Sequence, residues 1–196
     1  LKGGAEPALL LLHHMDVVPA DPRYWEVDPY SADVRNGDIY GRGALDTKML
    51  GIAHFQAFVA LHRLKVPLNR DVIFMATADE EAGGVWGAKW MVDNHWDSFL
   101  GHNGRLDYVL TEMGGWPHGG GEKVGITVGE KGIAWRRLRV KGTPGHGSMP
   151  YGTDNAVVKA AEVVSRLAKY RPAARLDELW AARIGASSLP EHLKAA

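Results

Sequence analysis

Ala8-Leu9-Leu10-Leu11-Leu12-His13-His14-Met15-Asp16 is the stretch that decides the fold. An unbroken aliphatic run that ends in a polar turn is typical of a strand buried on both faces of a parallel sheet. Similar runs occupy residues 71–78 and 108–111, and helical periodicity over residues 48–64 separates the first two runs. A further helix is expected around Trp86, Trp90 and Met91. The order predicts an α/β fold with a mostly parallel central sheet and helices on both faces.

The character of the sequence changes after Glu112. Residues 113–121 are rich in glycine and predict a flexible connection that contains a domain boundary. We therefore assign residues 1–117 to a first domain and residues 118–196 to a second, α+β domain. In the second domain, residues 123–128 and 133–140 predict an antiparallel hairpin. Asp154 is expected to cap a helix that runs to Tyr170.

Composition narrows the classes of partner and site. Lys plus Arg equals Asp plus Glu at 23 each, which argues against nucleic acid or an anionic membrane as the main partner. The chain has no cysteine, so any metal must be held by His, Asp and Glu. No apolar run approaches the roughly 20 residues that cross a bilayer.

The chain begins with Leu1, and its first predicted strand follows almost at once. We therefore expect an upstream segment to be missing, and the absence of a signal peptide says little about export. A cytoplasmic location is the expectation that remains.

Acidic and imidazole side chains stand at or near the ends of the predicted strands. Ligands bind at the carboxyl ends of parallel strands, and a mixture of imidazole and carboxylate suits divalent cations. The sequence therefore predicts a metal site. The candidates are His14 and Asp16 after the first strand, Asp46 before the helix, Glu80 and Glu81 after the second strand, and Glu112 after the third.

Each candidate also fits a structural role when it is taken alone. His14 fits a strand-end histidine, Asp46 a helix N-cap, and Glu112 a loop acid. Glu80 and Glu81 fit the enrichment of acids near a helix N-terminus, although adjacent carboxylates also suit a division between metal ligand and proton acceptor. In an extended backbone the carboxylate of Asp16 can hydrogen-bond the far ring nitrogen of His14. The convergence of these signals favours a site.

His146 lies in a loop stiffened by glycine and proline, residues 141–150. Such a loop can present a polar side chain to a partner surface, and an exposed turn histidine fits the same pattern.

Four motifs, in chain order, strongly resemble the co-catalytic zinc exopeptidase and deacylase family, which includes aminoacylases, glutamate carboxypeptidases, acetylornithine deacetylases and succinyl-diaminopimelate desuccinylases. They are His-Met-Asp-Val-Val-Pro at 14–19, Gly-Arg-Gly-Ala-Leu-Asp-Thr-Lys at 41–48, Asp-Glu-Glu-Ala-Gly-Gly at 79–84 and Gly-Thr-Pro-Gly-His-Gly-Ser-Met-Pro at 142–150. The resemblance implies a partial catalytic domain over residues 1–117. It implies a partial lid and dimerisation domain over residues 118–196.

The resemblance also implies two zinc ions, for which Co²⁺ or Mn²⁺ can substitute. His14, Asp46 and Glu112 would ligate the first zinc, Asp46 would bridge to the second, and Glu81 would ligate the second. A cis peptide bond is expected between Asp46 and Thr47. Under the same resemblance, Asp16 would orient His14, Glu80 would be the general base and acid, and His146 would stabilise the tetrahedral oxyanion.

One departure from the family pattern matters for activity. The last histidine ligand of the second zinc belongs to a later part of the catalytic domain, and His192 lies in no matching motif. We therefore expect this chain to bind one zinc well, to bind the second weakly, and to be poorly active. The expected reaction is hydrolysis of an amide bond in a small peptide or an N-acyl amino acid, by a homodimer joined through the lid. The alternative is a non-catalytic fragment or relative that acts as a dimerisation or binding module.

Overall fold

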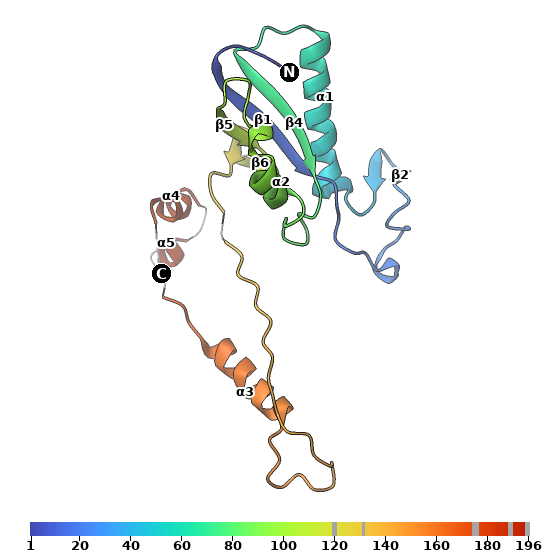
Figure 1. Ribbon diagram of the computed structural model, residues 1–196, viewed down its shortest axis with the longest axis vertical. Coiled ribbons are helices and arrows are strands. Elements are labelled where there is room, and N and C mark those ends of the chain that lie inside the picture. Colours follow the sequence, from blue (N-terminus) through green and yellow to red (C-terminus); the bar gives the residue numbers. More distant parts are fainter. Residues whose placement is uncertain (119–120, 131, 174–176, 188–189, 195–196) are drawn as a thin grey trace. The chain divides into compact units, whose positions relative to one another are not determined.

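Three parallel strands form the sheet that the first half of the sequence predicts (Figure 1). They are β1 (Glu6–His14), β4 (Arg70–Thr77) and β5 (Leu106–Leu110), in the order β4-β1-β5. β1 is central, and Ala8 and Leu10 in it are almost completely buried. In the register of the sheet His14 pairs with Thr77, so the ends of β1 and β4 coincide. The prediction of a parallel sheet in an α/β fold is confirmed.

The computed structural model describes residues 1–118, 121–130, 132–173, 177–187 and 190–194. The chain separates into two compact units, Leu1–Ile126 and Thr127–Ala196, and each is described here by itself. The assignment of residues 1–117 to a catalytic domain and of 118–196 to a lid stays a prediction.

Helix α1 (Met49–Arg63) packs against β1 and β4, and lies beside them in Figure 1. Phe74 of β4 contacts Phe55 and Phe58 of α1, with ring centroids 5.7 and 5.9 Å apart. His13 also faces α1, because a Cβ atom added at the buried Gly51 would lie 2.5 Å from its Cδ2 atom. His13 therefore points to the opposite side of β1 from His14, as alternate residues of a strand must.

The other elements of the first unit are short. They are η1 (Pro22–Tyr24), β2 (Asp33–Arg35), β3 (Asp38–Tyr40), η2 (Ala44–Lys48), α2 (Ala88–Asn94), η3 (Trp96–Phe99), β6 (Gly114–His118) and β7 (Lys123–Ile126). The antiparallel pair β2–β3 lies inside the long loop that precedes α1. Trp86 precedes α2 rather than belonging to it.

The predicted hairpin between residues 123–128 and 133–140 is wrong. β7 pairs antiparallel with β6, which lies in the stretch predicted as a flexible connection. Gly121 has a φ of 98° between the two strands, and this left-handed conformation helps the chain to turn back before β7. Among the described residues of 127–150, none lies in a strand. Residues 119, 120 and 131, which the two predictions include, lie outside the described residues.

The second unit contains α3 (Ala156–Lys169), α4 (Glu178–Ala186) and α5 (Glu191–Lys194). The predicted N-cap of α3 is wrong by one residue, because Asn155 accepts hydrogen bonds from the backbone N–H groups of Val157 and Val158. Asp154 instead pairs with Lys159, with 2.5 Å between Oδ1 and Nζ. No helix in the described part of the chain has the length and apolar content of a membrane span.

Candidate metal centre

His14 is the last residue of β1, and only 3% of its side chain is exposed. Its Nδ1 atom lies 3.0 Å from the backbone carbonyl oxygen of Asp16. A carbonyl oxygen can only accept a hydrogen bond, so Nδ1 must carry the proton and donate. This contact orients the ring and leaves the Nε2 atom to face other groups.

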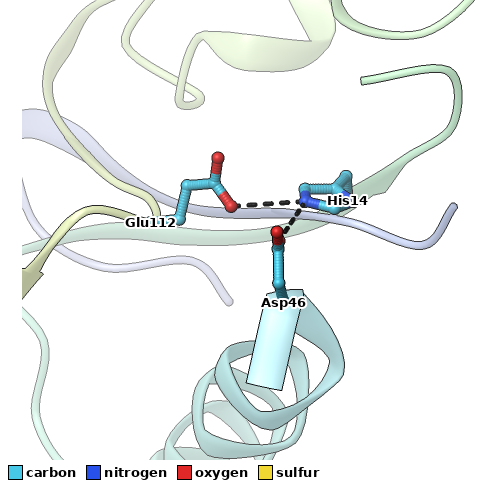
Figure 2. A group of neighbouring side chains, drawn as sticks. All are labelled: His14, Asp46 and Glu112. Atoms are coloured by element: carbon cyan, nitrogen blue, oxygen red, sulfur yellow. Dashed lines mark hydrogen bonds and ion pairs between the residues drawn. The ribbon is translucent and has the colours of Figure 1, made fainter. Parts of the chain in front are cut away.

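Two carboxylates meet the Nε2 atom of His14 (Figure 2). Asp46 Oδ1 is 3.1 Å away and Glu112 Oε2 is 3.2 Å away. One ligand atom from each of the three residues lies within 4.8 Å of the others. One imidazole and two carboxylates are a donor set that zinc and similar divalent ions accept, so these residues fit a metal ion.

The surroundings of His14 favour its positively charged form. Burial by itself lowers the pKa of His14. The hydrogen bond to Asp16, the charges of Glu112 and Glu80 and the hydrogen bond to Asp46 together outweigh burial and raise the pKa above its ordinary value. A proton, or a cation in its place, is therefore stabilised at this point.

A sharply bent segment delivers Asp46 to the cluster. Gly43 adopts a φ of 85°, a conformation that residues with a side chain rarely adopt, and a Cβ atom there would also clash with the side chain of Val17, so glycine is favoured. The peptide bond between Asp46 and Thr47 is cis, as the family resemblance implies. Lys48 occupies the N-cap position of α1 without a side-chain capping bond. The alternative role of Asp46 as the N-cap of this helix is therefore wrong.

The turn that holds Glu80 and Glu81 is fixed by Asp16. The backbone N–H groups of Glu80 and Glu81 each donate to the Asp16 carboxylate, at 3.1 Å. The carboxylate therefore contacts the turn, and its Oδ1 atom is 3.6 Å from His14 Nδ1. The sequence predicted that this carboxylate would accept the hydrogen bond from the His14 ring; in the structure the backbone carbonyl oxygen of Asp16 accepts it, at 3.0 Å.

The carboxylate of Glu80 reaches the edge of the cluster, where its Oε2 atom is 3.8 Å from His14 Nε2 and half of the side chain is exposed. Burial, followed by the charge of Glu112, raises the pKa of Glu80; Glu81 and Asp16 act in the same direction and His14 opposes them. Helix α2 has no acid in its first turn, so the alternative of helix N-terminal enrichment is wrong for Glu80 and Glu81.

The structure does not gather every predicted ligand. Among the described residues, the group close enough to share one ion consists of His14, Asp46 and Glu112, and Glu81 is not part of it. His146 lies in the second unit, where its Nδ1 atom contacts Ser148. The roles predicted for Glu81 and His146 stay predictions.

Lys48 is a residue to which the sequence analysis gave no role. Its Nζ atom donates to the carbonyl oxygen of Met15 at 3.2 Å, which ties the end of β1 to the segment that carries Asp46. The sequence carries a signal for this residue, since Lys48 follows Asp46 by two residues in the motif at 41–48.

Comparisons with known proteins agree with the motifs. The model of "Peptidase family M20/M25/M40" matches residues 10–182. The chain is 36% identical over 159 residues to the N-fatty-acyl-amino acid synthase/hydrolase PM20D1 of Xenopus tropicalis, covering 81% of this chain and 31% of the relative. It is 33% identical over 172 residues to the succinyl-diaminopimelate desuccinylase of Xanthomonas oryzae pv. oryzae. This match covers 84% of this chain and 43% of the relative.

A third relative is an uncharacterised metallohydrolase of Methanococcus maripaludis, 30% identical over 154 residues, with 78% of this chain and 35% of the relative covered. The chain thus spans less than half the length of these curated relatives. The crystal structure of human carnosine dipeptidase 1 matches 97% of this chain and 41% of that chain, with a TM-score of 0.52 and 21% identity. That match shows a shared fold. The chain belongs to the peptidase family M20/M25/M40.

Proposed function

We propose that this chain supplies catalytic residues of a metal-dependent hydrolase that cleaves an amide bond in a small peptide or an N-acyl amino acid. The observation that carries the proposal is the meeting of His14, Asp46 and Glu112 at the carboxyl end of the sheet, with Glu80 beside them. The names of the relatives support the reaction class, since they include a metallohydrolase, a desuccinylase and a fatty-acyl-amino acid hydrolase.

His14, Asp46 and Glu112 would hold the first zinc ion, and Asp46 with Glu81 would contribute to a second. Metal ions in such a site would lower the pKa of a water molecule and polarise the carbonyl group of the substrate. Because the Nδ1 proton of His14 is donated to Asp16, the Nε2 lone pair is available once the imidazole is neutral.

Glu80 would act as the general base and then the general acid. A carboxylate with a raised pKa lies closer to neutrality, where it can both accept a proton from water and return it to the leaving amine. Asp16 supports this role by holding the backbone of Glu80 and Glu81. His146 would donate a hydrogen bond to the oxyanion that forms as water attacks.

The decisive experiment is hydrolysis of N-acyl amino acids and dipeptides by the zinc-loaded chain, with and without a chelator. Because the ligand set of the second zinc is incomplete, the proposal expects weak turnover, which the chelator removes and added zinc restores. A zinc titration should show one tight site that is lost in His14→Gln and kept in His13→Gln, a neighbour on the opposite side of the same strand.

Bound zinc without any chelator-sensitive turnover would favour the alternative of a non-catalytic module. Dimerisation through residues 118–196 is a separate proposal, and sedimentation of the chain measures it.

A further inference from the structure

His146 lies on a loop whose two ends are held together. The backbone N–H of Thr143 donates to the carbonyl oxygen of Asp154 at 2.8 Å. Lys159 of α3 strengthens this junction, because its Nζ atom contacts both the carbonyl oxygen of Lys141, at 3.2 Å, and the carboxylate of Asp154, at 2.5 Å. Residues 143–154 therefore form a closed surface loop of the kind that often carries function.

The closing of this loop leaves no room beside Gly142. A Cβ atom there would lie 2.6 Å from the backbone nitrogen of Ala156, so a larger residue would force the junction apart. Within the loop, the backbone N–H of Met149 donates to the carbonyl oxygen of His146 at 3.0 Å and forms a tight turn. Contacts within the second unit thus define the backbone around His146.

Ser148 makes two contacts with one atom of His146. Its backbone nitrogen lies 3.2 Å from Nδ1, and its Oγ atom lies 2.7 Å from the same Nδ1. A backbone N–H can only donate, so Nδ1 must present its lone pair, and the hydroxyl must donate to it as well. A neutral imidazole with a bare Nδ1 carries its proton on Nε2.

We propose that Ser148 is a positioning residue that holds His146 in the tautomer with the proton on Nε2. This inference rests on the proposed function, in which His146 donates a hydrogen bond to an oxyanion. The other tautomer would present an Nε2 lone pair, which repels an anion instead of stabilising it. Ser148 thus selects the form of the neutral imidazole that can serve as a donor.

The test is the ¹⁵N NMR spectrum of the His146 ring in the whole chain, at a pH well above the ordinary histidine pKa of about 6.5. In the wild-type chain, Nδ1 should resonate as an unprotonated nitrogen and Nε2 as a protonated one. Ser148→Ala removes the hydroxyl and leaves the backbone N–H as a donor to Nδ1. We therefore expect the two ring resonances to move part of the way toward each other as the second tautomer becomes populated. Ser148→Thr, which keeps a hydroxyl, should restore the wild-type spectrum.

Ser165→Ala is the matched control, because Ser165 is an exposed serine of α3 in the same unit. It should leave the His146 resonances unchanged. Amide resonances that stay unchanged away from the substituted residue would show that each variant is folded. A wild-type spectrum with the proton on Nδ1 overturns the proposal. Identical His146 spectra for the wild type and Ser148→Ala also overturn it.

The kinetic readout separates this inference from the proposed function. If the chain hydrolyses an N-acyl amino acid, Ser148→Ala should lower kcat roughly 2- to 10-fold, the range for one lost hydrogen bond, and leave KM nearly unchanged. A zinc-loaded chain without any turnover would contradict the proposed function. The tautomer assignment would still stand if the spectrum of that chain shows an unprotonated Nδ1 of His146 and the spectrum changes in Ser148→Ala.

Discussion

Carboxylates lie beside histidines at both ends of the same sheet, but the pKa of the carboxylate is lowered at one end and raised at the other. At the amino end, Asp71 of β4 accepts hydrogen bonds from the backbone N–H groups of Gly3, at 2.7 Å, and His102, at 2.5 Å. The Nδ1 atom of His102 lies 2.8 Å from both oxygens of Asp71. At the carboxyl end, Glu80 lies near His14 but also near other acids.

The pKa values follow this difference. Burial favours the neutral form of Asp71, but the backbone N–H groups of His102 and Gly3 and the ring of His102 outweigh it and lower the pKa to about 2. Burial and the charge of Glu112 raise the pKa of Glu80. A carboxylate whose oxygens all meet donors stabilises the fold, whereas carboxylates that face each other leave a repulsion that a cation or a proton can relieve. The second arrangement is common at functional sites.

Among the substitutions that test this difference between the two ends of the sheet, Glu80→Gln is expected to have the largest effect. Turnover should fall by about 10²- to 10⁴-fold, because the amide cannot accept the proton from water. Metal content should stay the same, since Glu80 is not in the group of three that fits the ion. The metal-free variant should be at least as stable as the wild type, because a repelling charge is gone. Kinetics, elemental analysis and thermal unfolding measure the three quantities.

Glu26→Gln is the control for this variant, because Glu26 is an exposed loop residue. It should leave turnover unchanged. Full turnover by Glu80→Gln would show that Glu80 is not the general base. The raised pKa at the carboxyl end of the sheet would then have no role in catalysis.

Asp71→Asn should lower the stability of the chain, in contrast to Glu80→Gln, which should lower turnover. The amide group keeps one acceptor oxygen but places a donor against donors, so the free energy of unfolding should fall by about 2–4 kcal/mol. Urea denaturation measures this loss, and Asp38→Asn, at an exposed position of β3, should be close to neutral. An Asp71→Asn chain as stable as the wild type would show that the amino-end cluster does not hold the sheet.

Acid should weaken the amino end selectively. The pKa of Asp71 is lower in the folded chain than its ordinary value of 3.8, so its contribution is present above about pH 4 and is lost as the pH falls toward about 2. The shift corresponds to about 2 kcal/mol of unfolding free energy. Urea unfolding at a series of pH values should show this loss in the wild type and not in Asp71→Asn. Equal acid sensitivity of the two chains would contradict the assignment.

The sequence indicates which residues gather at the carboxyl end of the sheet, because its signals are local. Each of the three strands is an apolar run, and His14, Glu80 and Glu112 stand one or two residues after the ends of those runs. Parallel pairing then brings strand ends together without further information. The cis peptide bond at Asp46 came from the family resemblance and is confirmed.

The structural end could not be predicted in this way. Asp71 and His102 are 31 residues apart, and their contact requires the register of β4 and the turn before β5. The pairing of β6 with β7 depends on where a glycine-rich chain reverses, and both Asp154 and Asn155 are good helix caps. The sequence predicted the His14 ring as the partner of the Asp16 carboxylate, and the actual partners, the N–H groups of Glu80 and Glu81, depend on the position of a turn 64 residues away.

Asp16 lies at the carboxyl end of the sheet, yet its carboxylate oxygens accept hydrogen bonds as those of Asp71 do at the amino end. Asp16→Asn keeps one acceptor oxygen and should weaken the turn by about 1 kcal/mol. Hydrogen exchange of the Glu80 and Glu81 amides should quicken, while the ring nitrogens of His14 should be little affected, since His14 donates to the backbone carbonyl of residue 16. Asp93→Asn, at an exposed position of α2, is the control. A shift of the His14 resonances without faster exchange of the Glu80 amide would contradict this assignment. It would show that the Asp16 carboxylate contacts the imidazole and does not stabilise the turn.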